Sequence, residues 1–150
     1  FMGPAMVCGS YYVLTGAVTS IACLLSIPIG ALSAATLHAN NIRDIEHDRA
    51  AGKRTLATTL GRERSATEYV VWILVSYGAI GLTILIQPSF WPIAVTLLTI
   101  PNAIRLTVLA YQAPDAASLN RLLRKTAGLH LQFGSLLTIS LLVRAVLDRM

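Results

Sequence analysis

The sequence predicts an all-α protein: a multi-pass transmembrane helical bundle of about five membrane helices, the first of them truncated. Hydrophobic residues make up 55% of the 150-residue chain and charged residues only 13%, with a mean hydropathy of +0.64. A soluble domain usually has about a quarter of its residues charged. The apolar residues also gather in stretches close to the ~20 residues that a helix needs to cross a bilayer core. Length and pattern therefore predict a single domain inserted in a membrane.

The apolar stretches place the expected helices along the chain. The predicted spans are 1–15, which is short for a crossing, 20–39, 69–86, 90–110 and 126–147. Between them we expect small turns at 16–20 and 87–89 and polar loops at 40–64 and 111–125, with a short interfacial helix over 55–60. Pro28, Pro92 and Pro101 fall inside spans, where a proline kinks a helix but is tolerated if neighbours satisfy the freed backbone carbonyl.

The charges of the loops predict the orientation in the membrane. The segment 41–64 holds six Lys or Arg residues and the loop 111–125 holds three, whereas the two turns hold none. Two spans separate the loops, so both lie on one side, which the positive-inside rule makes the cytoplasmic side. Arg144 and Arg149 at the other end oppose this bias only weakly, because terminal arginines can snorkel. We therefore attribute the net charge of +5 to topology and not to nucleic-acid binding.

One charged segment interrupts the apolar chain, since residues 41–64 carry 10 of its 19 charged side chains. If this segment is helical, Asp44 and Asp48 share one face with Cβ atoms about 5–6 Å apart. Two carboxylates that close repel each other unless a cation lies between them, and Mg²⁺ is usually held by one or two carboxylates plus substrate phosphates. The nearby polar and basic side chains are Asn40, Arg43, Arg49, Lys53 and Arg54. The segment therefore predicts a joint site for a metal ion and a polyphosphate.

Residues 40–57 read Asn-Asn-Ile-Arg-Asp-x-x-x-Asp-Arg-x-x-Gly-Lys-Arg-Thr-Leu-Ala. This pattern resembles the second aspartate-rich motif of the UbiA family of membrane prenyltransferases. It is most similar to the branch that prenylates 1,4-dihydroxy-2-naphthoate in menaquinone biosynthesis. Weaker similarities run nearly end to end, at 9–13, 60–61, 101–106, 119–120 and 126–129. The family's earlier Asn-Asp-x-x-Asp motif is missing from this chain.

The resemblance implies a transferase that joins a polyprenyl group from polyprenyl diphosphate to 1,4-dihydroxy-2-naphthoate, giving demethylmenaquinone. It implies that Asp44 and Asp48 are catalytic and hold Mg²⁺. The diphosphate would contact Lys53 and Arg54, supported by Arg43, Asn41 and Asn40. The resemblance also implies a multi-pass protein of the cell inner (plasma) membrane, with its motif loop in the cytoplasm and the isoprenoid tail inside the apolar bundle.

The missing motif and the start at Phe1 lead us to expect a fragment. Residues 1–150 would be the C-terminal part of one UbiA-like transmembrane prenyltransferase domain, inactive without the N-terminal half that carries the first aspartate-rich motif. Two alternatives stay open. One is the same chemistry with another aromatic acceptor, 4-hydroxybenzoate or homogentisate. The other is a non-catalytic multispan protein, such as a transporter half, although a transporter is expected to place polar groups near the bilayer midplane.

Other residues allow more than one interpretation. Without the resemblance, Asp44 and Asp48 would be solvated loop acids paired with neighbouring arginines, a weak interaction at a surface. Tyr11 and Tyr12 either line an aromatic pocket or lie at the membrane interface. Arg105 either reaches a substrate or snorkels to lipid phosphates.

Several other titratable side chains are expected to have no catalytic role. We predict that Glu46 and His47 are exposed and that His130 lies in the first turn of the last span. Cys8 and Cys23 both fall in apolar stretches, so we expect small buried side chains, with a disulfide between them as the less favoured alternative. Neither cysteine has a His or Cys at metal-ligand spacing, so no zinc site is predicted.

Overall fold

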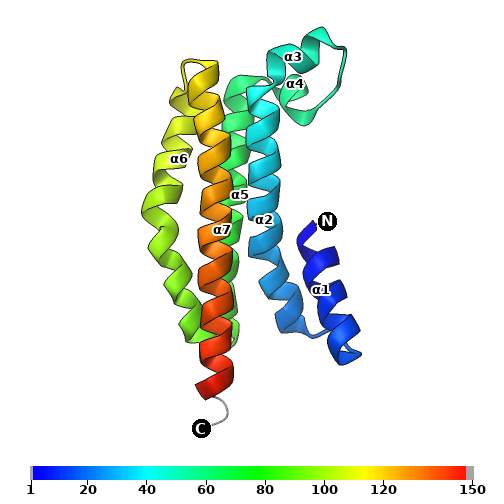
Figure 1. Ribbon diagram of the computed structural model, residues 1–150, viewed down its shortest axis with the longest axis vertical. Coiled ribbons are helices and arrows are strands. Elements are labelled where there is room, and N and C mark those ends of the chain that lie inside the picture. Colours follow the sequence, from blue (N-terminus) through cyan, green and yellow to red (C-terminus); the bar gives the residue numbers. More distant parts are fainter. Residues whose placement is uncertain (1, 148–150) are drawn as a thin grey trace.

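The computed structural model describes residues 2–147, and every regular element in that range is a helix (Figure 1). The elements are α1 (Met2–Thr15), α2 (Ser20–Arg43), α3 (Ile45–Ala50), α4 (Leu56–Leu60), α5 (Arg62–Ile86), the 3₁₀ segment η1 (Pro88–Thr99), α6 (Ile100–Gln112) and α7 (Ala116–Leu147). Four segments in the described range are long and apolar enough to cross a membrane: α2, α5, η1 with α6, and α7. The predicted all-α multi-pass bundle is confirmed.

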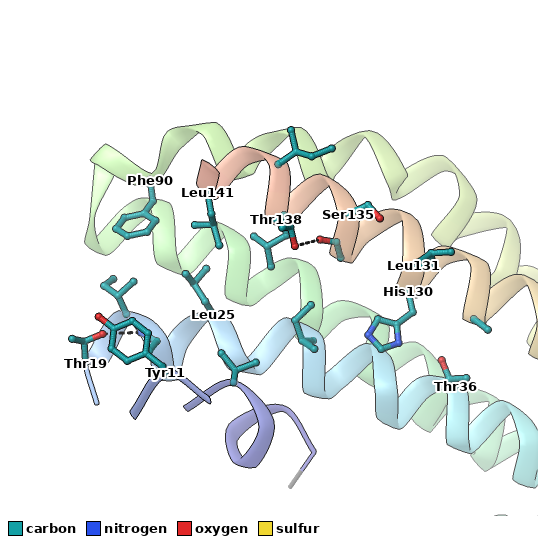
Figure 2. A pocket seen from close by; sticks show the side chains of 18 residues that line it. Tyr11, Thr19, Leu25, Thr36, Phe90, His130, Leu131, Ser135, Thr138 and Leu141 are labelled. Carbon is teal, nitrogen blue, oxygen red and sulfur yellow. Dashed lines mark hydrogen bonds between the residues drawn. The ribbon is translucent and has the colours of Figure 1, made fainter. Parts of the chain in front are cut away.

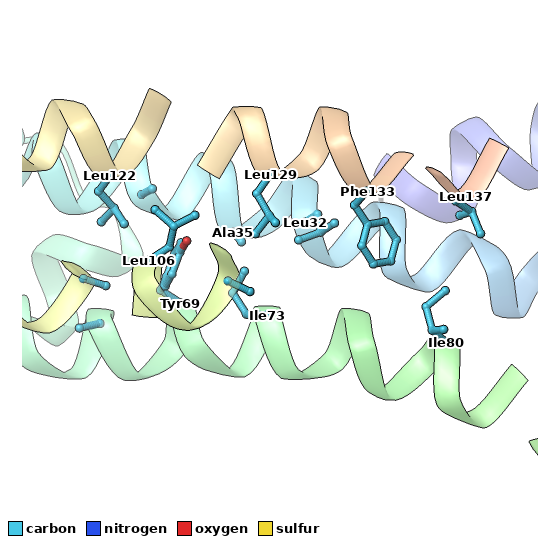
Figure 3. Close-up of a cluster of buried hydrophobic side chains, with 14 of the residues drawn as sticks. Leu32, Ala35, Tyr69, Ile73, Ile80, Leu106, Leu122, Leu129, Phe133 and Leu137 are labelled. Carbon is cyan, nitrogen blue, oxygen red and sulfur yellow. The ribbon is translucent and has the colours of Figure 1, made fainter. Parts of the chain in front are cut away.

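The four long segments pack side by side, and α1 lies against the lower half of α2 as drawn in Figure 1. Figure 3 shows the core between them, where Leu32 of α2 meets Leu129 and Phe133 of α7. The side chain of Tyr69 on α5 is also fully buried, and its hydroxyl lies 2.9 Å from the hydroxyl of Thr126 on α7. Because lipid tails are as apolar as these side chains, such helices associate through close packing and interhelical hydrogen bonds.

Helices α1 and α2 cross at a pair of glycines. A Cβ atom at Gly3 would overlap the carbonyl oxygen of Ser26 and lie 2.7 Å from the Cα atom of Gly30. Across the same two helices, the Sγ atoms of Cys8 and Cys23 are 3.8 Å apart, both as free thiols. Cys8 is half-buried and Cys23 is exposed, so the prediction of two buried cysteines is wrong. The reason is that α1 packs mainly on α2, which leaves the outer side of this pair uncovered.

The polar loop predicted over 111–125 is also wrong, because only residues 113–115 separate α6 from α7. Asp115 caps the start of α7: its Oδ1 atom accepts a hydrogen bond from the backbone N–H of Ser118 at 2.7 Å. That bond holds the pKa of Asp115 below its ordinary value. With 32 residues, α7 is about 48 Å long and exceeds the ~30 Å hydrocarbon core. The polar residues of 116–125 therefore mark helix that extends beyond the hydrocarbon.

Other helices also extend further than the sequence predicted. α2 continues to Arg43 and α5 begins at Arg62, so both helices extend further toward the charged segment than predicted. His130 lies midway along α7 and not in its first turn, because the helix starts ten residues earlier than expected. The short helix expected over 55–60 is confirmed as α4, which begins with a reciprocal capping box between Thr55 and Thr58.

Both basic segments lie at one end of the bundle, as the count of spans requires. Figure 1 shows α3, α4 and the α6–α7 connection together at the top, and we call this the motif end. At the opposite end, the guanidinium carbon of Arg144 lies 3.4 Å from the ring centroid of Phe90. Arg149 falls outside the residues that the structure describes.

Candidate functional site

The first acid of the motif lies at a break between two helices. Asp44 ends α2 and precedes α3, with φ −95° and ψ 8°. The helical spacing nevertheless continues, because the backbone N–H of Asp48 donates to the carbonyl oxygen of Asp44 at 2.8 Å. Gly52 follows α3 with φ +69°, a left-handed conformation that favours glycine. Gly52 thus follows the helical run that carries both aspartates, which is interrupted at Asp44.

The carboxylate of Asp44 is held by the residue before it. Arg43 donates from Nε to Oδ1 and from Nη2 to Oδ2, both at 2.7 Å, and the amide of Asn40 donates to Oδ2 at 3.3 Å. The Arg43 hydrogen bonds lower the pKa of Asp44 below its ordinary value, with weaker contributions from the charges of His47 and Lys53. Asp44 is therefore ionised at neutral pH.

The second acid has different surroundings. Asp48 lies on α3 with 4% of its surface exposed. The Lys53 amine lies 3.2 Å from Oδ1 and 3.3 Å from Oδ2, so it contacts both oxygens of this carboxylate. The side chain of Lys53 is itself 61% exposed. A buried carboxylate depends on such a partner, because an unpaired charge is costly to remove from water. One face of the Lys53 amine thus remains open to solvent.

A residue far along the chain completes these contacts. The guanidinium of Arg43 donates from Nη1 to the side-chain oxygen of Asn120 at 3.3 Å, across 77 residues of sequence. It also donates from Nη2 to the side-chain oxygen of Asn40 at 2.9 Å. We call Asn40, Arg43, Asp44 and Asn120 the Arg43 network. Sequence reasoning did not identify Asn120 as a site residue; its only signal was the weak similarity at 119–120.

A buried histidine joins the two helices on either side of the motif. His38 of α2 is 4% exposed, and its Nε2 atom lies 3.0 Å from the backbone oxygen of Ser65 on α5. The same atom is 3.5 Å from a carboxylate oxygen of Glu68. No local sequence pattern indicated this contact. It fixes the start of α5 against the part of α2 that leads into the motif.

The remaining predicted site residues lie around these contacts. Asn41 is half-buried near the end of α2, and Arg54 is exposed in the segment before α4. Glu46 and His47 are exposed, as predicted. An exposed ion pair of 3.1 Å joins Glu46 to Arg49, so Arg49 contacts neither aspartate in the bonds described.

A large apolar cavity of about 1090 Å³ lies between α1, α2, the start of η1 and α7 (Figure 2). Its lining extends from Thr36 and His130 on the side nearer the motif to Phe90 at the other end. On α2, Thr36, Asn40 and Asp44 follow one another at four-residue spacing, which places them along one face of the helix. The Arg43 network therefore lies beyond one end of an apolar cavity, on the same side of α2.

Two tyrosines and one arginine whose roles stayed open lie in different surroundings. Tyr11 lines the cavity, whereas Tyr12 is 56% exposed, so the two tyrosines differ in their surroundings. Arg105 lines a smaller pocket between α6 and α7, which shares no lining residue with the cavity.

Comparison with known proteins now adds to the geometry. Residues 1–134 match the UbiA prenyltransferase family. The chain belongs to this family. It is 32% identical to 1,4-dihydroxy-2-naphthoate octaprenyltransferase of Bacillus subtilis (strain 168), over 95% of the chain and 46% of that protein. It is 30% identical to the Haemophilus influenzae protein of the same name, over 95% of the chain and 46% of that protein. It is 35% identical to UbiA prenyltransferase domain-containing protein 1 of Mus musculus, over 88% of the chain and 38% of that protein.

Membership of the UbiA family confirms the resemblance first seen in the motif around Asp44. The chain spans less than half the length of these relatives. No solved structure matches it.

The donor groups of this UbiA-family chain fit a hard divalent cation. Asp44 and Asp48 present carboxylates on successive helical turns, and each already faces a basic side chain. Within residues 2–147, no three His, Cys, Asp or Glu side chains come together. Mg²⁺ does not need such a group, because it usually keeps several waters and binds one or two carboxylates together with substrate phosphates.

Proposed function

We propose that this chain is the C-terminal part of a UbiA-type domain whose whole enzyme transfers a polyprenyl group from polyprenyl diphosphate to 1,4-dihydroxy-2-naphthoate. The immediate product would be the quinol form of demethylmenaquinone, in menaquinone biosynthesis. The observation that carries the proposal is the Arg43 network with Asp44, which lies beyond one end of an apolar cavity on the same side of α2 and is followed on α3 by Asp48 with its partner Lys53. The names of the Bacillus subtilis and Haemophilus influenzae relatives support the acceptor.

The basic side chains of the motif end would bind the diphosphate. Lys53 and Arg54 are exposed and follow the turn at Gly52, so both can reach an anion at this end. Arg43, with Asn41 and Asn40 beside it, would support the same group from the end of α2. Positive groups fixed before the reaction stabilise the charge that develops on the departing diphosphate.

Asp44 and Asp48 would hold Mg²⁺, which supplies Lewis-acid stabilisation of the leaving group when bound. The chain prepares both carboxylates for this role. Arg43 keeps Asp44 ionised and oriented, and Lys53 holds the two oxygens of the buried Asp48. On binding of a diphosphate, these two bases are positioned to exchange carboxylate contacts for phosphate contacts.

The apolar cavity would hold the isoprenoid tail. In the reaction, the allylic C–O bond breaks and its electron pair leaves with the diphosphate. The ring carbon that carries the carboxylate then forms the new C–C bond, and the carboxylate leaves as CO₂. Water in the cavity would capture the allylic cation, so an apolar lining protects the reaction. A volume of about 1090 Å³ can accommodate a long hydrocarbon chain.

We further propose that the protein lies in the cell inner (plasma) membrane with its motif end in the cytoplasm. The support is the excess of Lys and Arg at that end, since cytoplasmic loops carry this excess. A cytoplasmic motif end would face the water-soluble head of a prenyl diphosphate whose tail lies in the membrane.

Replacement of Asp48 tests the role of the acid pair. In the complete protein that contains this segment, Asp48→Asn should lower Mg²⁺-dependent prenyl transfer by about 100-fold or more. The variant should still be recovered from the membrane fraction. The matched control is Glu46→Gln, which neutralises an exposed acid on the same helix and should keep full activity. If Asp48→Asn retained activity, the proposed ligand role would be wrong.

Product analysis tests the acceptor separately. Membranes that contain the complete protein would be supplied with equal amounts of 1,4-dihydroxy-2-naphthoate, 4-hydroxybenzoate and homogentisate, and the products identified by mass spectrometry. We expect the prenylated naphthoquinol to dominate. A prenylated benzoate or homogentisate product would support prenyl transfer but show that the proposed acceptor is wrong. Absence of any prenylated product would favour the non-catalytic alternative.

A further inference from the structure

A second pocket of about 340 Å³ lies between α6 and α7. Three basic side chains and two amide side chains line it, together with apolar residues and one glycine, and none of its lining residues is acidic. The lining residues are Asn102, Arg105, Leu106, Arg124, Lys125, Gly128, Leu129 and Gln132. Three basic side chains line one small pocket, and no acidic side chain in the lining neutralises them. The pocket therefore favours binding of an anion.

This pocket faces a different direction from the apolar cavity. Residues of α7 line both, but the cavity uses Ala127 and Gly134 whereas the pocket uses Lys125 and Gly128. α2 contributes to the cavity and not to the pocket, and the reverse holds for α6. The pocket therefore opens on the side of α7 away from the proposed prenyl site.

The depth of the pocket matches the level of lipid headgroups. Arg124 and Lys125 are the last charged residues before an apolar run, since 126–143 contains no Asp, Glu, Lys or Arg. On the neighbouring helix, Arg105 is the one charged residue, and it lies seven residues, about 10 Å, before the end of α6. A long arginine side chain at this depth can extend its head to the interface. The three cations thus lie where hydrocarbon gives way to phosphate.

The pocket is also shaped before any ligand binds. The amide of Asn102 donates to the side-chain oxygen of Gln132 at 3.2 Å, which joins α6 to α7 at the deeper end. Gly128 provides open space, because a Cβ atom built there would meet no other atom within 4 Å. The lining thus combines fixed walls, free volume and positive charge.

We propose that this pocket binds the phosphate of an anionic lipid headgroup from the leaflet at the motif end. Arginine binds phosphate oxygens in a bidentate manner, and lysine adds a point charge. Basic pockets between transmembrane helices on the cytoplasmic side are suited to anionic headgroups. The side chains of Arg105, Arg124 and Lys125 are exposed, so a headgroup can reach them. This inference does not depend on the proposed prenyl transfer.

Charge removal provides the first test. The complete protein that contains this segment would be titrated in detergent with dioctanoyl-phosphatidylglycerol, and bound lipid counted by native mass spectrometry. The double variant Arg105→Gln with Lys125→Gln should bind about 30-fold more weakly, since each base near an anionic surface contributes a factor of about five. The control Arg64→Gln with Arg121→Gln removes the same charge from exposed positions outside the pocket. An equal loss in the control would mean a diffuse attraction and would overturn the proposal.

Steric filling provides a second test that keeps every charge. Gly128→Leu places a side chain in the pocket, whereas Gly78→Leu places one in equally open space on α5. We expect only Gly128→Leu to abolish binding of phosphatidylglycerol, with the helical circular dichroism of both variants unchanged. Undiminished binding by a folded Gly128→Leu variant would contradict the proposed pocket.

Competition distinguishes lipid from free anion. Dioctanoyl-phosphatidylcholine, inorganic phosphate and pyrophosphate would be titrated in parallel. Tight binding of phosphatidylglycerol, with phosphatidylcholine and the free anions at least tenfold weaker, supports a headgroup site. If pyrophosphate bound more tightly than the lipid and lost affinity in the Arg105→Gln and Lys125→Gln variant, the lipid assignment would be wrong.

Discussion

The two ends of the bundle are held together in different ways. At the motif end, directed polar contacts join residues far apart in sequence: Arg43 to Asn120, and the guanidinium of Arg62 to the backbone oxygen of Ala113 at 3.0 Å. Away from the motif end, α1 and α2 meet through close packing at Gly3, near the middle of α2, and at the opposite end Arg144 contacts the ring of Phe90.

This difference predicts that changes in different parts of the bundle affect function and stability unequally. If the proposed function holds, polar groups at the motif end bind a ligand, so changing one should alter chemistry more than folding. Closely packed positions away from the motif end touch no charged group of the motif, so changing one alters folding first.

The largest effect is expected at Lys53. In the complete protein, Lys53→Met removes the amine that faces both oxygens of Asp48, and prenyl transfer should fall about 100-fold. Initial rates with saturating prenyl diphosphate and Mg²⁺ provide the measurement. Lys53→Arg keeps the charge and should restore most of the rate, and Arg64→Met, an exposed base at the same end, should have no effect. Normal turnover in Lys53→Met would mean that the lysine only balances a buried charge.

At the crossing of α1 and α2, away from the motif, Gly3→Leu should destabilise the protein by about 1–3 kcal/mol, as overpacking of a filled contact does. The added side chain meets the backbone of Ser26 and Gly30, which cannot move aside without separating α1 from α2. Thermal unfolding in detergent, followed by circular dichroism, measures the loss. Gly9→Leu on the same helix enters open space and provides the control. Equal midpoints for the two variants would show that the crossing is not tightly packed.

Between the two ends, Tyr69→Phe should cost about 1 kcal/mol, the usual net value of a hydrogen bond. The change removes the hydroxyl that meets Thr126 at 2.9 Å, in a position with no exposed surface. Thr126→Val removes the other partner, and the double variant should lose less than the sum of the two single losses. Strict additivity of the three unfolding free energies would indicate that the two hydroxyls do not interact.

The smallest effect is a dependence of stability on pH at Asp44. Because the folded state lowers the pKa of this carboxyl, its contribution is fully present above the ordinary value of 3.8 and is lost as pH falls through the lowered pKa. The contribution is within about 1 kcal/mol, since the pair with Arg43 is partly exposed. Unfolding midpoints of the unmodified protein and Asp44→Asn should differ at pH 7 and converge as the pH falls through the lowered pKa of Asp44. A constant difference across this range would exclude the ionised carboxylate as its cause.

The sequence predicted those features that depend on local pattern. Apolar runs located the spans, and the four-residue spacing of Asp44 and Asp48 indicated a shared helical turn, because both signals are complete within a few residues. The start of α7 was misjudged because polar residues outside the hydrocarbon were taken as a loop, although Leu, Arg and Lys favour helix.

Contacts that depend on packing could not be predicted from one sequence. Asn120 meets Arg43 only because α7 packs beside α2, and no local pattern carries that information. The same holds for the crossing at Gly3 and for the pocket that Arg105 shares with α7. A glycine or an arginine in an apolar stretch indicates a close helix crossing or a polar contact. Which residue it contacts depends on how the helices pack.

The contact between Arg43 and Asn120 also bears on the order of events during synthesis. Seventy-seven residues separate the partners, so at 5–20 residues per second the ribosome needs roughly 4–15 s to supply the second after the first. Throughout this interval, the newly made aspartate segment lacks its anchor on the last helix. A chain released before α7 has inserted would therefore carry every acid of the motif and still leave Arg43 unanchored.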